Sequence, residues 1–416
     1  MPSRTQPIDR RLLALSVIEG VASIGATLLT VGIFFFTEDR FQWDLKKNFL
    51  LACGQGAVYV IGALGANTLA ARFGRRRALI AIYTFATALT TVPLFFRAAW
   101  VIVIVLLCYN VAMGAGWPLL ESIVSSDVDA HEMSRRLGLY NLVWSGTGAL
   151  ALAVNGAIIQ YWAAGVFLAA ALTHAAAGLV MIFFVPPSAT RSAGAPPDPH
   201  AAAHPEPEPE LVAQRRLALW LSRISLPATY MVLYAIAAMM PLLPSMQELS
   251  TSAKTIVGSV WLVTRWAAFW VLGATTFWHT RPRLLLWAAC AMLVAFLGIA
   301  IRPSDLFAAA SLPTSIDLAS MILWQAILGV ALGMIYSGSL YFGMVLSDGS
   351  TEHGGYHEAL IGLGSILGPG VGLLAMTVSS AGIRAGIAGV AALVGATVLV
   401  AAGASIYAGR PRANGT

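Results

Sequence analysis

Apolar residues along this chain gather in long continuous runs, and polar residues gather in the short segments between them. A helix that spans a membrane needs roughly 20 mostly apolar residues, so the pattern predicts twelve spanning helices. We place six at 12–36, 49–70, 78–97, 100–125, 139–162 and 164–185, and six at 221–245, 255–279, 284–301, 318–346, 359–380 and 385–407. Helices are expected because lipid cannot satisfy an open strand edge, and the runs lack the alternation of a membrane barrel.

One proline-rich polar stretch, residues 186–216, divides the apolar runs into two groups of six. It reads PPSATRSAGAPPDPHAAAHPEPEPELVAQRR and has no helical apolar periodicity. We expect a partly extended tether that acts as a passive hinge. The predicted fold is therefore an all-α integral membrane protein with a six-helix bundle over 1–185, a linker over 186–216 and a second, pseudo-symmetric six-helix bundle over 217–416.

Composition supports a membrane protein rather than a soluble one. The 416 residues are 58% hydrophobic and 11% charged, whereas soluble domains carry about 25% charged residues. Lys and Arg concentrate in alternate connections, which predicts that both termini and the linker are cytoplasmic. We expect a monomer in the lipid bilayer of a bacterial inner (plasma) membrane, without nucleic acid as a partner. The three cysteines lie in apolar runs and indicate neither a metal site nor a disulfide framework.

The connection after the second run carries a recognisable motif, Asn67-Thr-Leu-Ala-Ala71-Arg72-Phe-Gly74-Arg75-Arg76-Arg77. It resembles the signature loop of the major facilitator superfamily, in which a Gly, three residues, Asp, Arg, any residue, Gly, Arg and Arg follow one another. Arg72, Gly74, Arg75 and Arg76 match that pattern, and the family's first Gly and its Asp are replaced here.

Two further glycine patterns are similar to motifs of exporters in the same superfamily. The fourth run has Gly114 and Gly116 after Asn110, where such exporters often have Arg. A Gly-x-x-x-Gly-Pro-x-x-Gly motif, typical of their fifth span, stands in the eleventh run, the symmetry counterpart of the fifth. It supplies four hinge candidates that either bend the helix or pack statically: Gly364, Gly368, Pro369 and Gly372.

The resemblance implies two bundles that rock about a substrate held near the middle of the membrane. It also implies a gate on the cytoplasmic side, formed by the signature loop. We add to this gate Glu121, at the end of the fourth run, and His357 and Glu358, before the eleventh run.

Ionisable residues inside apolar runs usually face a cavity or a partner, because lipid solvates charge poorly. Glu19 in the first run is the candidate for proton coupling, and the alternative is a permanent hydrogen bond to a neighbouring helix. Arg265 in the eighth run either clamps an anionic substrate group or pairs with Glu19 across the two halves. His174 in the sixth run is expected to be a helix-contact histidine.

Aromatic and amide side chains on the inner runs are candidates for the binding site, because pockets combine aromatic walls with a few oriented polar groups. Besides Arg265, the substrate-binding candidates are Gln55, Tyr59, Asn110, Trp117, Asn141, Trp144, Tyr234, Gln325 and Tyr336.

The segment Glu352-His353-Gly-Gly-Tyr-His357-Glu358 contains His residues four apart, but its glycines disfavour a helix, so we expect a gate loop and no metal. The sequence contains no phosphate-binding loop or hydrolase motif, and we expect neither an enzyme nor a cofactor. The predicted function is secondary active transport of a small organic solute, coupled to protons, with export favoured slightly. The alternatives are uptake of a small anionic or sugar-like solute and a non-transporting sensor or assembly protein.

Overall fold

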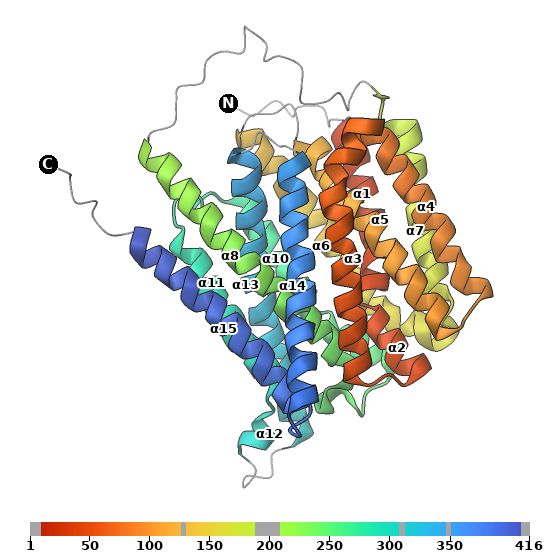
Figure 1. Cartoon of the computed structure of the whole chain (residues 1–416), viewed down its shortest axis with the longest axis vertical. Coiled ribbons are helices and arrows are strands. Elements are labelled where there is room, and N and C mark those ends of the chain that lie inside the picture. Colours follow the sequence, from red (N-terminus) through yellow and green to blue (C-terminus); the bar gives the residue numbers. More distant parts are fainter. Residues whose placement is uncertain (1–9, 126–129, 188–208, 308–312, 347–350, 409–416) are drawn as a thin grey trace, which may run out of the picture.

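The computed structural model describes residues 10–125, 130–187, 209–307, 313–346 and 351–408, and every regular element within these ranges is helical (Figure 1). Twelve of its helical segments are long and apolar enough to cross a membrane. The predicted all-α, twelve-span architecture is confirmed.

The described residues of the first half form the α-helices α1 (Arg10–Thr30), α2 (Ile33–Phe41), α3 (Leu45–Phe73), α4 (Arg75–Phe95), α5 (Ala99–Ser125), α6 (Ala130–Trp162) and α7 (Gly165–Phe184). Together α1 and α2 form one span, interrupted by a turn at residues 31–32. At this turn the Gly32 carbonyl accepts from Asn155 Nδ2 of α6 at 2.9 Å and from the Phe35 amide at 3.2 Å, so α6 supports the turn directly.

The second half contains α8 (Pro209–Met239), the short 3₁₀ helices η2 (Met240–Leu242) and η3 (Pro244–Met246), α9 (Thr251–Gly258), α10 (Val260–Ala274), α11 (Arg283–Ala300), α12 (Pro303–Leu306), α13 (Thr314–Leu346), α14 (Thr351–Val378) and α15 (Ile383–Ala408). The helix α8 begins inside the stretch that the sequence assigned to the linker. The eighth span consists of α9 and α10, which meet at Ser259.

The segment 352–358 corrects one prediction. It is the first two turns of α14 rather than a loop, so the expected effect of its two glycines was wrong. Packing overrides their low helix propensity. A Cβ on Gly354 would lie 3.4 Å from the Pro118 Cα, and one on Gly355 would lie 3.0 Å from the Ala63 carbonyl oxygen. The glycines let α14 approach α5 and α3 of the first half closely.

We call the end of the molecule where α7 ends and α8 begins the linker end, and the opposite end, with α2, α9 and α12, the distal end (Figure 1). Helices of the two halves pack side by side along their length, α3 on α14 and α6 on α9 and α10. The core between them positions the site described below.

The signature loop lies at the linker end and fastens helices of the first half to one another. Gly74 joins α3 to α4 with a φ of 79°, which suits glycine. Arg75 donates to the carbonyl and hydroxyl oxygens of Ser122 on α5, at 3.2 and 2.6 Å. Arg76 donates to the carbonyls of Val185 and Ile182, at 2.6 and 2.9 Å. The Arg72 guanidinium lies 5.3 Å from the ring centre of its neighbour Phe73.

At the distal end, polar contacts connect the two halves. Lys254 of α9 forms an ion pair with Glu38 of α2 at 3.1 Å. The Thr251 hydroxyl donates to Asp39 Oδ1 at 2.8 Å, and the Gly156 backbone amide donates to the Thr255 hydroxyl at 3.0 Å. Contacts between the halves therefore occur at this end as well as along α3 and α14.

Candidate substrate and coupling site

A cavity of about 130 Å³ lies between the two halves. Helices α1, α3, α5 and α6 line it from the first half, and α8, α10, α13 and α14 from the second. Its polar and aromatic lining consists of Glu19, Ser23, Thr27, Thr30, Tyr59, Trp117, Tyr140, Trp144, Tyr230, Tyr234, Trp261, Arg265, Tyr336 and Glu358.

Three side chains of this lining carry formal charge. Glu19 comes from α1, Glu358 from α14 and Arg265 from α10, and each is at most 4% exposed. Two carboxyl groups face one guanidinium, which leaves one net negative charge when both carboxyls are ionised. Because the cavity is poorly hydrated, this balance is sensitive to binding a proton or a charged solute.

Two hydroxyl groups, those of Ser23 and Tyr140, are neighbours of the Glu19 carboxyl. The Ser23 hydroxyl, one turn further along α1, donates to Glu19 Oε1 at 3.2 Å. The second oxygen, Oε2, is buried and accepts no hydrogen bond from the described residues. The carboxyl group therefore keeps an acceptor available for a solute or a proton.

Arg265 lies between two indole rings. Its guanidinium carbon is 4.4 Å from the ring centre of Trp144 and 4.9 Å from that of Trp261, which are cation–π distances. Among the described residues, no carboxylate forms a salt bridge with Arg265, so the predicted pair with Glu19 is not present in this structure. The indole rings solvate the charge instead, and the guanidinium remains available to a solute.

The aromatic wall around Arg265 is continuous across the two halves. The Trp144 ring centre is 5.3 Å from that of Tyr336 and 5.5 Å from that of Phe269. Tyr230 and Tyr234 of α8 also line the cavity, and their ring centres lie 6.4 Å apart. Such a wall suits a solute with a planar or apolar part.

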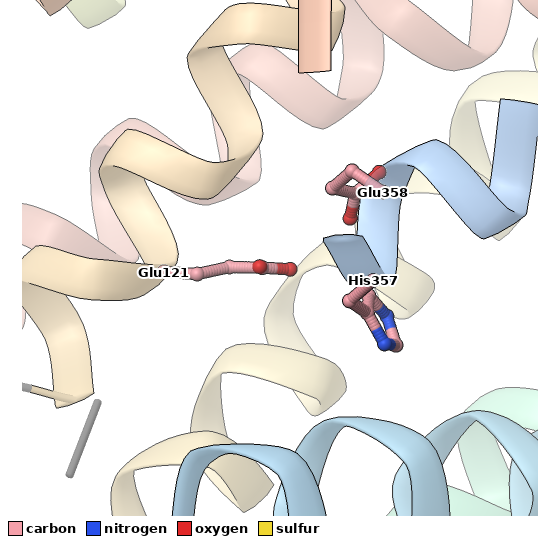
Figure 2. A group of neighbouring side chains, drawn as sticks. All are labelled: Glu121, His357 and Glu358. Atoms are coloured by element: carbon pink, nitrogen blue, oxygen red, sulfur yellow. The ribbon is translucent and has the colours of Figure 1, made fainter. Parts of the chain in front are cut away.

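A second group of ionisable side chains lies beside the cavity. Glu121 of α5 points toward Glu358 and His357 of α14, as Figure 2 shows, and their ligand atoms lie within 4.8 Å of one another. The Tyr59 hydroxyl of α3 donates to Glu358 Oε2. Glu358, predicted as a gate residue, thus belongs to the cavity lining, and Glu121, predicted for the same gate, lies next to it. Their role in a gate stays a prediction.

Six of the ten predicted substrate-binding residues line the cavity, and four lie elsewhere. The six are Tyr59, Trp117, Trp144, Tyr234, Arg265 and Tyr336. The other four are buried amides outside the lining. Asn110 donates to the Leu106 carbonyl, and Gln55 donates to the Leu29 carbonyl. Asn141 accepts from the Trp144 indole, and Gln325 forms no hydrogen bond with a described residue.

The remaining predicted residues are packing groups in this structure. His174 is fully buried and shares a 2.8 Å hydrogen bond with the Tyr109 hydroxyl, as expected for a helix-contact histidine. A Cβ on Gly364 or Gly368 would lie 2.3 Å from a carbonyl oxygen of α8, and one on Gly372 would lie 2.7 Å from Phe49. Pro369 lies inside the continuous helix α14. Close approach accounts for the three glycines, and their predicted hinge role stays a prediction.

Sequence reasoning missed several lining residues, among them Ser23, Tyr140 and Trp261. Each is four residues from a charged or aromatic residue that was selected: Glu19, Trp144 and Arg265. Residues four apart share one face of a helix. Extending each selected position by one turn finds all three.

A profile of the Major Facilitator Superfamily matches residues 15–351, most of the chain. The chain belongs to the Major Facilitator Superfamily. It is therefore a membrane transporter by family and not an enzyme. A search of curated protein sequences found no match.

Solved structures of superfamily transporters have the same fold. A crystal structure of an aspartate-to-alanine variant of the nucleoside transporter NupG superposes with a TM-score of 0.64 at 13% identity and covers 96% of this chain and 100% of that chain. The structure of NupG without that substitution gives a TM-score of 0.63 at 12% identity, with 96% and 99% covered. At this identity the likeness concerns the fold alone.

Proposed function

We propose that this protein is a proton-coupled antiporter that exchanges a small organic cation for protons by alternating access. The observation that carries the proposal is the position of Glu19 in a cavity between the halves, where the lining bears one net negative charge when its carboxyls are ionised. The aromatic wall adds cation–π and apolar contacts for the same class of solute.

Competition at Glu19 supplies the coupling. An ionised Glu19 attracts an organic cation through its free Oε2, and a protonated one does not. Binding of the cation therefore displaces the proton, and binding of the proton displaces the cation. An inward proton gradient then drives the cation outward, which makes export the predicted direction. A bacterial inner membrane, which carries such a gradient, stays the predicted location.

Contacts between the halves lie on both sides of the cavity, which supports alternating access. The Lys254–Glu38 ion pair closes the distal side. Toward the linker end, Glu121 meets His357 and Glu358. Opening one set of contacts while the other persists exposes Glu19 to one side of the membrane at a time. The contacts at each end act as gates, and one chain is sufficient for the cycle.

Uptake of a small anionic solute is the second candidate, because Arg265 has no ion-pair partner among the described residues. In that case protonation of Glu19 raises the positive charge of the cavity and strengthens anion binding. The two candidates thus predict opposite effects of pH on affinity.

A binding experiment separates them. Purified protein in detergent is screened at pH 6 and pH 8 by thermal unfolding against organic cations, organic anions and neutral sugars or nucleosides. Stabilisation by cations that is larger at pH 8, and lost in Glu19→Gln, supports the proposal. Stabilisation by anions that is larger at pH 6 supports the second candidate. Absence of stabilisation by any class contradicts both and favours a non-transporting role.

A further inference from the structure

Three metal-ligating side chains from the two halves of the chain converge beside the cavity (Figure 2). Glu121 comes from α5, and His357 and Glu358 come from the second turn of α14. They are exposed by 0%, 2% and 3%, so water does not compete strongly for them. Buried ionisable groups need partners, and the partners present in the chain are incomplete.

His357 is oriented as a ligand. Its Nδ1 shares a 3.0 Å hydrogen bond with the Ser339 hydroxyl of α13, and its Nε2 is buried without a hydrogen-bond partner among the described residues. An imidazole held through one nitrogen, with the other free, is the arrangement found at metal-binding histidines.

The two carboxyl groups have unused acceptor positions. Both oxygens of Glu121 are buried and accept no hydrogen bond from a hydroxyl, amide or charged donor of the described residues. The group within hydrogen-bonding reach is the Glu358 carboxyl, which can donate only when it is protonated. Glu358 accepts from Tyr59 through Oε2, which leaves Oε1 for a ligand. Two adjacent buried carboxylates repel each other, and a bound cation removes that repulsion.

We propose that Glu121, His357 and Glu358 form a binding site for a divalent cation of the zinc class, with Ser339 as a positioning residue. One imidazole nitrogen and two carboxylate oxygens suit Zn²⁺ better than Mg²⁺ or Ca²⁺, which prefer oxygen ligands alone. A tetrahedral ion with bonds of about 2.1 Å holds its ligands about 3.4 Å apart. The ligand atoms, now within 4.8 Å, reach that spacing by small side-chain rotations.

The location gives the ion a consequence for the molecule. Glu121 belongs to the first half and the other two ligands to the second, so a bound ion cross-links α5 to α14. It stabilises the arrangement in which the halves are packed together toward the linker end and slows any opening there.

Direct binding tests the site. Protein without an affinity tag is stripped with a chelator and dialysed against Zn²⁺ in detergent, and the bound metal is measured by elemental analysis and titration calorimetry. We expect one ion per chain, with an affinity that falls at least about tenfold in Glu121→Gln and in His357→Gln. The controls are Glu248→Gln, an exposed carboxyl, and His279→Gln, whose pKa burial lowers to about 4, and both should bind as the wild type does.

Two further variants or probes keep the test decisive. Ser339→Ala retains all three ligands and should weaken Zn²⁺ binding less than loss of a ligand does. Co²⁺ in place of Zn²⁺ should give the intense visible absorption of a four-coordinate ion, and His357→Gln should remove it. Absence of a saturable ion, or equal binding by wild type, Glu121→Gln and His357→Gln, would overturn the proposal. Zn²⁺ binding is measured without transport. A negative result would therefore contradict the metal site and would not bear on the antiport proposal, which the ligand screen tests separately.

Discussion

Replacing Gly56 by alanine should push the two halves of the molecule apart. Gly56 lies on α3 where α3 packs against α14 of the other half. A Cβ at this position would be 2.8 Å from the Ser365 Cβ, 2.9 Å from the Gly362 carbonyl oxygen and 3.0 Å from the Ile366 nitrogen. All three atoms belong to the backbone or are fixed to it, so no rotamer change relieves the clash.

The cost follows from these distances. The shortest contact is about 0.6 Å below an ordinary van der Waals contact of 3.4 Å, and overpacking of this kind costs about 1–3 kcal/mol. If α3 and α14 separate when the halves rock, the clash exists only while the two helices are packed together. The substitution then destabilises the packed arrangement by about 1–3 kcal/mol relative to the separated one. The population of the packed arrangement relative to the separated arrangement falls about 5- to 150-fold.

A native cysteine reports the separation. Cys53 lies on α3, and its thiol donates to the Ile366 carbonyl of α14 at 3.5 Å. In a protein with Cys108→Ser and Cys290→Ser, the alkylation rate of Cys53 by a membrane-permeant maleimide follows the population in which α3 and α14 are apart. Gly56→Ala should raise this rate about 5- to 150-fold.

Gly54→Ala is the matched control on the same helix. Its Cβ would meet only the Leu107 side chain of α5, in the same half, at 3.1 Å. This substitution should leave the alkylation rate of Cys53 unchanged. Equal rates for Gly54→Ala and Gly56→Ala would refute the view that α3 and α14 form a separable interface.

Three further substitutions test the cavity and the distal contacts. Glu19→Gln should weaken binding of an organic cation about 10- to 150-fold, because a charged hydrogen bond is worth about 1.5–3 kcal/mol. It should also abolish pH-gradient-driven transport while solute exchange persists, and gradient-driven transport at the wild-type rate would contradict this. Arg265→Lys keeps the charge but loses planar stacking on Trp144, so solute affinity measured by calorimetry should change, and an unchanged affinity would remove Arg265 from the site. Lys254→Met should lower the free energy of unfolding in detergent by about 1.5–3 kcal/mol, and combining it with Glu38→Leu should recover part of the loss; purely additive losses would show that the pair is not coupled.

The fold was predictable because lipid imposes simple rules on sequence. Twelve apolar runs and the motif at Arg72–Arg76 were sufficient for the architecture and the family. The helical state of Gly354 and Gly355 was not predictable, because it depends on α14 approaching α5 and α3, which are far away in the chain. Local propensity cannot contain that information.

The charged residues of the site were predictable because charged side chains are rarely buried in a membrane. Glu19 and Arg265 were found because an ionisable residue inside an apolar run stands out. Their distance from one another was not predictable, since Arg265 stacks on indole rings instead of pairing. Glu358 was assigned to a polar loop because the glycines before it concealed the start of the helix. Its predicted role in a gate stays a prediction. Buried amides such as Asn110 satisfy their own helix, and no sequence pattern distinguishes them from ligands.

The most direct test of the account measures the direction of proton movement. Purified protein is reconstituted into liposomes that contain a pH-sensitive dye, and a cation identified in the binding screen is added outside. Antiport predicts that the lumen becomes alkaline as the cation enters, and that Glu19→Gln removes this change while Glu248→Gln retains it. Acidification of the lumen, or entry of the cation without any change in pH, would contradict proton antiport.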